Sequence, residues 1–281
     1  MSKQTAFDKL DLLGVEIDAI SNADAITYIC THAAPGQPPI YVTKPYVEFL
    51  DRAYHRPELQ ELINEAELTL PDGVALTWAA AYLYAGKRSA WRFWKTLFQI
   101  VLAPDELRWP LPDRAAGTNF TWPLLQEAAR QHLRVFLVGS PKNSSIDHTA
   151  TTLIAAIPNL KIAGTHTGRD TASPVGEISD QWLASLAAST SAAKPDLILV
   201  GMGFPLQEQA CAYLKTHCQH GVFIGEGGTF DYEQFGGQRA KAPAWVQRIG
   251  LEWLWRLLLE PRRIIRQLAI PRFIYRIWRY R

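Results

Sequence analysis

The stretch 197–225, LILVGMGFPLQEQACAYLKTHCQHGVFIG, determines the fold. Two short apolar runs, Leu197–Gly201 and Val222–Ile224, flank a helical segment, Leu206–His217. A buried strand, a glycine turn, a helix and a second buried strand form a βαβ unit, in which the two strands are parallel. The stretch therefore predicts a parallel sheet with helices packed on its faces.

The same pattern recurs towards the N-terminus. Further short apolar runs occur at Leu13–Ile17, Ile40–Thr43, Leu68–Leu70, Val135–Val138 and Lys161–Gly164. Another helical segment covers Ser144–Ile157. We therefore predict an α/β protein with a Rossmann-like parallel sheet and helices on both faces, in a domain spanning residues 1–240. A chain of 281 residues, 48% of them hydrophobic, is long enough to bury such a core.

Three of the predicted strands end in glycine-bearing turns that open helices. These turns are Val138-Gly139-Ser140, Val200-Gly201-Met202-Gly203 and Ile224-Gly225-Glu226-Gly227-Gly228. Because parallel strands end at one edge of a sheet, the turns together predict a single crevice for a phosphate-bearing ligand. The chain has neither a GxGxxG fingerprint with a ribose-binding acid nor a GxxxxGK[ST] loop, which weakens ordinary dinucleotide and P-loop interpretations.

A fourth strand end, at Leu68–Leu70, leads to the carboxylate of Asp72 instead of to bare backbone. One explanation is structural, because Pro71-Asp72-Gly73 is a good turn and Asp72 could cap a helix that begins near Val74. The other is chemical, because a carboxylate at the same sheet edge as the glycine turns could act as a general base. The residues alone leave both explanations open.

The charge of the chain is unevenly distributed. From Arg239 to Arg281 there are 11 Lys or Arg and two acids, a balance of +9, whereas the remainder has 18 basic and 25 acidic residues, a balance of −7. Arginines alternate with large apolar residues after Pro261, although Pro271 should break or kink the helix. Such a segment is typical of helices that lie in a lipid headgroup layer. Nucleic acid could attract the same charge, but the aliphatic residues would then have no apolar partner. We predict a basic C-terminal appendage, residues 241–281, that contacts a membrane surface, and no nucleic-acid partner.

An aromatic segment also occurs at residues 91–102. Trp91, Trp94, Phe98 and Leu102 recur at spacings of three and four residues, which predicts an amphipathic helix. Its outer residues could pack in the core, face a membrane or cover an acceptor. The proline-containing stretch Ala103–Asp113 is predicted to be a loop.

Other features limit where the protein acts and what it binds. The N-terminus has no secretory signal pattern, and no run of ~18 apolar residues predicts a spanning helix, so we expect a cytoplasmic protein. Cys211, His217, Cys218 and His220 are close in sequence, but their spacing matches no common zinc pattern, and no bound metal is expected.

These motifs together resemble the WecG/TagA/CpsF glycosyltransferases, also called glycosyltransferase family 26. The resemblance covers the chain from about Leu13 to Arg263 and depends on the order and spacing of several motifs. They are Tyr41-Val42-Thr43, Leu70-Pro71-Asp72-Gly73, Arg114-Ala115-Ala116-Gly117-Thr118, Val135–Ser140, Pro158–Gly168, Val200–Glu208, Gly228-Thr229-Phe230-Asp231 and Gly250-Leu251-Glu252-Trp253.

The resemblance implies a sugar transfer with inversion at the anomeric carbon. The donor would be a UDP-sugar, carrying an N-acetylmannosamine-type sugar or a hexose, and the acceptor a polyprenyl-pyrophosphate-linked glycan. The reaction would take place peripherally on the inner face of the cell membrane, in the synthesis of cell-surface polysaccharide or teichoic acid. The resemblance also implies a Rossmann-like core and a C-terminal appendage that meets the membrane.

The resemblance also implies roles for individual residues. Asp72 would be the general base, with Thr43 beside it hydrogen-bonding the sugar or acceptor. The residues expected to bind the donor or its nucleotide are Gln207, Arg114, Gly139, Ser140, Gly201, Gly203, Gly228 and Asp231. The chain has no Asp-x-Asp motif, so no metal or other cofactor is expected to hold the diphosphate. Arg114 and the tail arginines Arg256, Arg262 and Arg263 would neutralise the departing UDP instead.

The chain departs from the family pattern at a few positions. It has Lys44-Pro45 where an asparagine is usual, Asn119 where an aspartate is common, and Lys241 where an arginine is common. The stretch Ser89–Pro112 resembles an insertion. A non-catalytic membrane-associated nucleotide-binding protein and a different α/β enzyme remain alternatives. The sequence leaves a homo-oligomer open.

Overall fold

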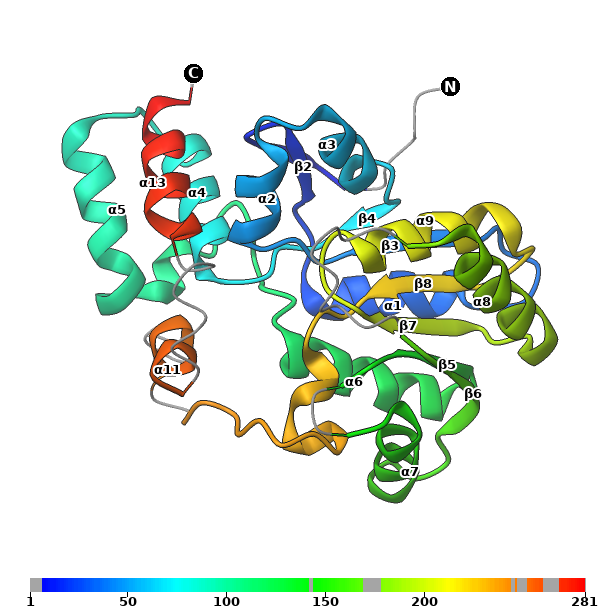
Figure 1. Cartoon of the computed structure of the whole chain (residues 1–281). Helices are drawn as coiled ribbons and strands as arrows, with labels where there is room; N and C mark the ends of the chain where they lie inside the picture. Colours follow the sequence, from blue (N-terminus) through cyan, green and yellow to red (C-terminus); the bar gives the residue numbers. More distant parts are fainter. Residues whose placement is uncertain are drawn as a thin grey trace.

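The computed structural model describes residues 7–141, 144–168, 178–243, 246, 252–259 and 268–280. Its main element is a six-stranded sheet in the order β4-β3-β8-β7-β5-β6, and β1 and β2 form a separate two-stranded sheet (Figure 1). The strands are β1 (Lys9–Leu12), β2 (Val15–Asp18), β3 (Ile40–Thr43), β4 (Leu68–Thr69), β5 (Arg134–Gly139), β6 (Lys161–Thr167), β7 (Leu197–Gly201) and β8 (Val222–Gly225).

Helices cover both faces of the sheet and extend beyond it. The helices are α1 (Asn22–His32), α2 (Val47–Ala53), α3 (Pro57–Asn64), α4 (Val74–Tyr84), α5 (Ala90–Leu102), α6 (Gly117–Arg130), α7 (Ile146–Ala156), α8 (Asp180–Ala193), α9 (Leu206–His217), α11 (Glu252–Leu259) and α13 (Ala269–Arg279). Short 3₁₀ turns are η1 (Pro104–Leu107), η2 (Thr229–Asp231) and η3 (Glu233–Phe235).

The large sheet is parallel at every strand pair. In β7, Leu197 and Leu199 face a core built with α1, α6 and α7, whereas Ile198 and Val200 face a core built with α8 and α9. This alternation follows from the two-residue period of a strand, and it explains why strands that are buried on both faces appear as continuous apolar runs. The predicted α/β fold, a Rossmann-like parallel sheet with helices on both faces, is confirmed.

One predicted strand lies outside the parallel sheet to which it was assigned. Leu13–Ile17 was expected to pair in the parallel sheet, but β2 pairs antiparallel with β1 in a hairpin outside it. Leu13 and Gly14 both have positive φ, 60° and 86°, and form the two-residue turn that joins the strands. Such a turn matches the twist of a hairpin, so the first apolar residue of the run lies in the turn and not in a strand.

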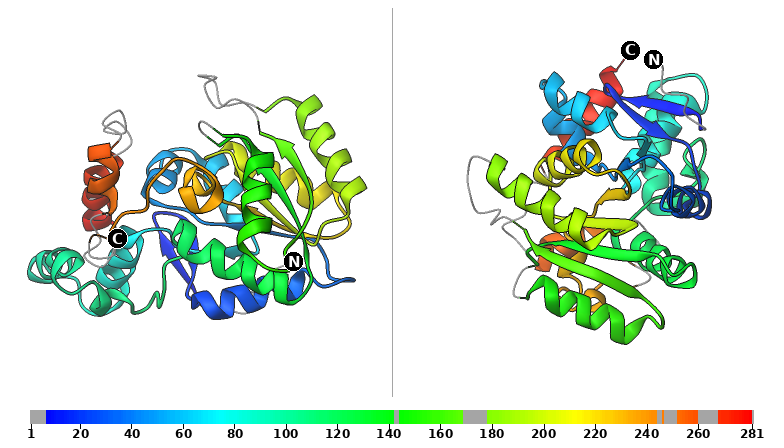
Figure 2. Two further views of the ribbon diagram at one scale, coloured as in Figure 1. Left: turned by 90° about the horizontal axis from the view of Figure 1, so that it is seen from below. Right: turned by 90° about the vertical axis from the view of Figure 1, so that its right-hand side faces the viewer.

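A helical lobe, composed of β1, β2, α2 to α5, η1 and α13, encloses a third core. Its centre is Trp78 on α4, whose ring lies 5.7 Å from that of Phe93 on α5. Phe93 in turn lies 6.0 Å from Trp278 on α13. Figure 1 and the left view of Figure 2 show this lobe at one side of the sheet, with α5 at its outer edge. Residues distant in sequence therefore share one core.

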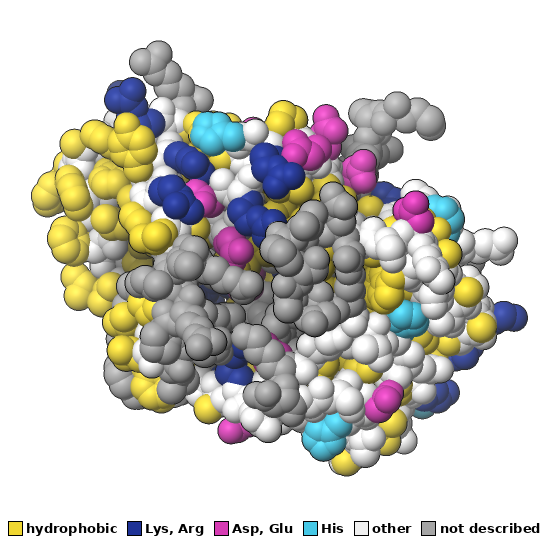
Figure 3. All heavy atoms as spheres, viewed as in Figure 1, with side chains coloured by type: hydrophobic (Ala, Val, Ile, Leu, Met, Phe, Trp, Pro, Cys, Tyr) yellow, Lys and Arg dark blue, Asp and Glu magenta, His cyan; other side chains and the backbone are white. Residues whose placement is uncertain are grey.

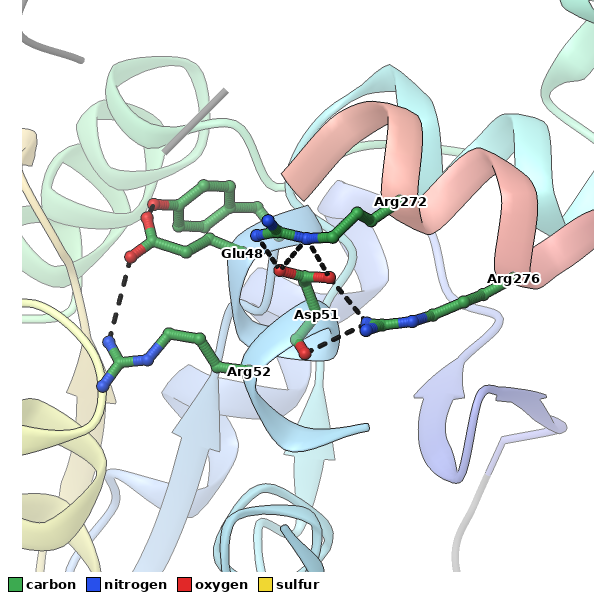
Figure 4. A network of polar contacts seen from close by, with 6 residues as sticks. Glu48, Asp51, Arg52, Arg272 and Arg276 are labelled. Carbon is green, nitrogen blue, oxygen red and sulfur yellow. Dashed lines mark hydrogen bonds and ion pairs between the residues drawn. The ribbon is translucent and has the colours of Figure 1, made fainter. Parts of the chain in front are cut away.

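The C-terminal helix α13 is attached to the lobe by apolar and ionic contacts. Phe273 and Ile277 are fully buried on its inner face. On α2, the Asp51 carboxylate accepts from Arg272 Nη2 and from Arg276 Nη1, each at 2.6 Å (Figure 4). Pro271, expected to break or kink the helix, does not interrupt α13, because α13 begins at Ala269 and the proline lies in its first turn, where the missing N–H has no intrahelical acceptor. Residues 260–267, where a preceding helix would have to end, lie outside the described residues.

Candidate functional site

The predicted base, Asp72, lies at the carboxyl edge of the sheet beside the end of β3. Thr43 of β3 stands opposite Thr69 of β4. Beyond this pair, the Leu70 N–H donates to the Thr43 carbonyl at 2.9 Å, and the Asp72 N–H donates to the Pro45 carbonyl at 2.9 Å. The backbone of Asp72 is therefore fixed next to the chain that leaves β3, and its side chain is half-buried.

The segment that leads into α6 joins this position from a distant part of the sequence. The Ala115 N–H donates to the Pro71 carbonyl at 2.8 Å, and Asn22 Nδ2 donates to the Arg114 carbonyl at 3.1 Å. The backbones of Arg114 and Asp72 therefore lie close together. The contact of the Arg114 guanidinium with a donor or leaving group stays a prediction.

Gln207, predicted to contact the donor, connects two of the glycine turns. Its Oε1 accepts from the Gly203 N–H at 3.0 Å and from the Gly227 N–H at 2.7 Å. Its Nε2 donates to Glu208 Oε1 at 2.9 Å, and its side chain is buried. Gln207 thus holds the turns after β7 and β8 against each other, and its contact with a donor stays a prediction.

Glu208 is a residue that the sequence prediction missed. The Thr43 hydroxyl donates to Glu208 Oε1 at 3.2 Å, so both Thr43 and Gln207 bond the same carboxyl oxygen. Burial raises the pKa of Glu208 to about 8, and the hydrogen bonds from Gln207 and Thr43 oppose that rise only in part. Glu208 is therefore largely protonated at neutral pH. An acid in the first turn of a helix usually faces solvent, so the sequence gives little signal for this buried role.

Gly139 and Gly201 end neighbouring strands, as predicted, but a side chain covers them. A Cβ atom at Gly201 would lie 2.6 Å from the Phe230 ring, and one at Gly139 would lie 3.2 Å from it. Both glycines therefore make room for a buried phenylalanine. Ser140, which is exposed, donates its hydroxyl to the Gly168 carbonyl at 2.7 Å. Contacts of these three residues with a nucleotide stay predictions.

Gly228 and Asp231 belong to one turn held by Arg239. The Arg239 guanidinium forms an ion pair with Asp231 at 2.9 Å and donates to the Gly228 carbonyl at 3.3 Å. Its plane also lies 5.4 Å from the Tyr232 ring. The Asp231 carboxylate thus has a structural partner, and its predicted contact with substrate stays a prediction.

A buried ion pair crosses the same edge. Lys44, which follows Thr43, places Nζ 2.7 Å from Glu226 Oε2, and Thr121 on α6 donates to that oxygen at 2.6 Å. Both charged side chains are almost fully buried. Lys44 was noted only as a departure from the family pattern, and Glu226 only as part of a glycine turn.

Asn119 and Lys241, two other residues noted as departures from the family pattern, form a hydrogen bond with each other. Lys241 Nζ donates to Asn119 Oδ1 at 2.5 Å. Asn119 lies in the first turn of α6, and its N–H donates to the carbonyl of the N-cap residue Ala116 at 2.8 Å. The amide of residue 119 and the ammonium of residue 241 are therefore paired with each other.

Helix N-termini add positive electrostatic potential at this edge. The N-cap residues of α4, α6 and α9 are Gly73, Ala116 and Pro205, and none of them caps its helix through a side chain. One first-turn N–H of each helix donates to a preceding carbonyl, those of Leu76, Asn119 and Gln207. The helix dipole at each N-terminus still favours an anion. With Asp72 and Arg114 beside them, the arrangement can hold an anionic ligand next to a proton acceptor.

The predicted tail contacts lie largely outside the described residues. Arg262 and Arg263 fall between α11 and α13 in that undescribed part, and of Arg256 only the backbone, in α11, is described. Over the described ranges, no three His, Cys, Asp or Glu side chains gather as a metal site would require. Among the described helices, none has both the length and the apolarity to cross a bilayer.

Comparison with known proteins places the chain in a family. The model of the glycosyl transferase WecG/TagA/CpsF family matches residues 10–94 and 98–281. The chain belongs to the WecG/TagA/CpsF family. Within the stretch 89–112, only residues 95–97 fall outside the match. The resemblance inferred from the motifs is confirmed.

Two curated relatives in this glycosyltransferase family carry the same name, N-acetylglucosaminyldiphosphoundecaprenol N-acetyl-beta-D-mannosaminyltransferase. One, from Staphylococcus aureus (strain NCTC 8325 / PS 47), is 27% identical over 270 residues, covering 96% of this chain and 92% of the relative. Another, from Bacillus subtilis (strain 168), is 34% identical over 163 residues, covering 58% of this chain and 59% of the relative.

Proposed function

We propose that this protein transfers N-acetylmannosamine from a UDP-sugar to N-acetylglucosamine linked through a diphosphate to a polyprenol. Membership of the WecG/TagA/CpsF family and the name shared by the two relatives support the transferase class, the sugar and the acceptor. The observation that supports the proposal is that the backbone of Asp72 lies close to that of Arg114, just before the start of α6, which has no side-chain cap. A base and an anion-binding edge are the two elements that such a transfer needs.

The proposed chemistry is a single displacement at the anomeric carbon. The acceptor hydroxyl attacks this carbon from the face opposite the nucleotide, a new C–O bond forms, and the bond to the UDP oxygen breaks. Asp72 accepts the hydroxyl proton, and UDP departs with the bonding electron pair. Attack from the opposite face inverts the anomeric configuration.

The departing diphosphate gains negative charge, which must be stabilised. In the proposal, Arg114 and the N-termini of α4, α6 and α9 supply this stabilisation. Arg256, Arg262 and Arg263 are proposed to approach when the appendage meets the membrane. No metal or other cofactor is part of the proposed mechanism, in keeping with the lack of an Asp-x-Asp motif.

The buried residues of the site are proposed to shape it. Gln207 fixes the turns at Gly203 and Gly227, which lie at the predicted nucleotide crevice. Protonated Glu208 then orients both Gln207 and Thr43 through one oxygen. In this proposal, loss of Glu208 lowers activity through the position of the turns and not through proton transfer.

The proposed place of action is the inner face of the cell membrane, where the protein binds peripherally during the synthesis of a cell-envelope polymer. A polyprenyl diphosphate is anchored in a bilayer, so an enzyme that acts on its head group works at the lipid surface. The basic balance of +9 from Arg239 to Arg281 favours an anionic surface.

The direct test is UDP release from a panel of UDP-sugars in the presence of a synthetic polyprenyl-diphosphate N-acetylglucosamine. We expect release with UDP-N-acetylmannosamine that depends on both substrates. If only a UDP-hexose supports release, the transferred sugar is a hexose and not N-acetylmannosamine. Tight UDP binding without transfer to any acceptor would favour the non-catalytic nucleotide-binding alternative.

A further inference from the structure

Helix α5 has two apolar faces. Phe93 and Thr96 are buried against the lobe, and Thr96 accepts a hydrogen bond from Trp78 Nε1 at 3.1 Å. The opposite side, here called the α5 outer face, consists of Trp91, Trp94, Phe98, Val101 and Leu102. Trp91, Phe98 and Leu102 are 78%, 64% and 80% exposed. A helix that is amphipathic in sequence is thus apolar on both its buried and its exposed side.

Exposed large apolar residues concentrate in this part of the molecule. Those among the described residues are Tyr84, Trp91, Trp94, Phe98, Val101, Leu102, Trp109, Ile154, Leu258, Leu268, Tyr275 and Trp278. Of these twelve, eleven lie between α4 and Trp109 or in and around α11 and α13, and only Ile154 lies on a helix of the sheet domain. Figure 3 shows the yellow side chains gathered over this side of the molecule. Clustering of this kind marks an interaction surface, because scattered exposed apolar residues would be ordinary.

The charges around the α5 outer face are basic. Lys95 is exposed within the stripe, one turn from Trp91 and Phe98, and Lys87 and Arg88 are exposed just before the helix. Helix α5 contains no acid. Two acids follow in η1, where Asp105 pairs with Arg108 at 2.9 Å and Glu106 bonds Gln99. An aromatic stripe with interspersed lysines fits a surface that is apolar inside and anionic at its boundary.

The helix is held firmly in this orientation. Arg92 donates to the carbonyls of Ala81 at 2.6 Å and Ala85 at 2.7 Å, which close the C-terminal end of α4. The Ser89 hydroxyl caps the N-terminus by accepting from the Arg92 N–H at 3.1 Å. The outer face is therefore a fixed surface and not the result of a loosely attached helix.

The outer face is also connected to the candidate site. Helix α4 begins directly after Asp72 and Gly73 and leads to α5. Its 11 residues span about 16 Å at 1.5 Å per residue. Helix α5 runs back along this length, because Arg92 bonds carbonyls at the end of α4 and Thr96 accepts from Trp78 in the first half of α4. The α5 outer face therefore lies alongside the helix that follows the predicted base.

We propose that the α5 outer face, with the half-exposed Trp278 of α13, whose ring lies 6.0 Å from that of Phe93 on α5, docks onto a phospholipid bilayer that carries anionic headgroups. The tryptophans lie at the headgroup level, Phe98 and Leu102 enter the acyl boundary, and Lys87 and Lys95 contact the anionic lipids. This inference deepens the proposed function, which supplies the membrane-borne acceptor. It assigns membrane binding to α5 in addition to the basic appendage.

The test is co-sedimentation of the full chain with vesicles of phosphatidylcholine containing about 30% phosphatidylglycerol. The variant Trp91→Ser/Phe98→Ser/Leu102→Ser removes the three most exposed apolar side chains of the stripe and leaves the inner face intact. We expect its partition into the vesicles to fall at least about tenfold. Lys87→Glu/Lys95→Glu should lose binding to the anionic vesicles and leave the weak binding to pure phosphatidylcholine unchanged.

The matched control is Ile154→Ser, which removes an exposed apolar side chain from α7 and should bind as the wild type does. Unchanged partition of the triple variant, or equal losses in the triple variant and the control, would overturn the proposal. A wild-type dimer that the triple variant converts to a monomer, without any vesicle binding by either, would assign the face to a second copy instead. Vesicle binding is measured without acceptor or donor, so failure of the proposed transfer would leave this result standing. Turnover on a short-chain water-soluble acceptor should be the same in the triple variant and the wild type.

Discussion

Lys44 and Glu226 form a buried ion pair that joins the ends of β3 and β8, with Nζ and Oε2 2.7 Å apart. The pair lies beside the predicted base, because the residue after Lys44 accepts the Asp72 N–H. A buried charge that loses its partner is costly, whereas removal of both charges together can be nearly neutral. Substitutions in this pair should therefore change the free energy of unfolding strongly, and they report how the carboxyl edge of the sheet is stabilised.

Lys44→Met should lower the free energy of unfolding by about 3–5 kcal/mol, because Glu226 would stay buried with only Thr121 as a donor. The double variant Lys44→Met/Glu226→Gln should lose clearly less than the single variant. Urea unfolding at pH 7 measures both. If the double variant loses as much as Lys44→Met and the single variant Glu226→Gln added together, the ion pair is not coupled as described.

Glu208→Gln should change how stability depends on pH. Burial raises the pKa of Glu208 from its ordinary 4.5 to about 8, so the folded state holds a proton that the unfolded state releases. In the wild type, the contribution of Glu208 to stability is full below about pH 4.5 and declines as the pH rises towards about 8. Glutamine cannot titrate, so the difference in unfolding free energy between variant and wild type should shift in favour of the variant over this range. A pH-independent difference would show that Glu208 is ionised in the folded protein.

Gly201→Ala should destabilise the protein by about 1–3 kcal/mol, because the added Cβ would lie 2.6 Å from the Phe230 ring. Adding Phe230→Leu to this variant should recover part of the loss, although Phe230→Leu alone creates a cavity. Thermal unfolding of the single and double variants gives the coupling between the two positions. An additive result would mean that Phe230 does not press on the end of β7.

Asp51→Asn should weaken the attachment of α13 to α2, because the Asp51 carboxylate pairs with both Arg272 and Arg276 of α13 (Figure 4). Arg276 is mostly buried and its guanidinium lies 4.3 Å from the Tyr54 ring, whereas the Arg272 side chain is 53% exposed. Arg276→Gln should therefore cost about 1–3 kcal/mol, and Arg272→Gln less than about 1 kcal/mol. Limited proteolysis of the C-terminus should follow the same order. Equal effects of the two arginine substitutions would contradict the difference in burial.

The spacing of apolar residues in the sequence correctly predicted helices whose buried face repeats regularly. Leu206–His217 has the bounds that were predicted, because its apolar residues repeat at helical spacing between a glycine turn and a second glycine. Leu13 was misplaced because one apolar residue in a two-residue turn looks like the start of a strand. Pro271 was expected to interrupt a helix, and α13 begins only two residues before it, so the proline lies in a first turn that tolerates it.

The candidate site was predictable only in part. The motifs placed Asp72 and Thr43 at neighbouring strand ends, and the β3–β4 pairing confirms this. The approach of Arg114 to Asp72 depends on a tertiary backbone bond, for which the sequence gives no signal. Glycine has several uses, so Gly201 could indicate a phosphate cradle or room for Phe230, and only the packing distinguishes them. Buried acids such as Glu208 are equally hidden, because an isolated glutamate is normally exposed.

The central claim is that Asp72 accepts the proton of the acceptor hydroxyl. Its most direct test is the turnover of Asp72→Asn with UDP-N-acetylmannosamine and the polyprenyl-diphosphate acceptor, alongside UDP binding by calorimetry, with the surface substitution Glu58→Gln as the control. The account predicts that kcat of the Asp72 variant falls by about 10²–10⁴-fold while UDP affinity and the control stay at the wild-type level. Turnover of Asp72→Asn within a few-fold of the wild type would contradict it.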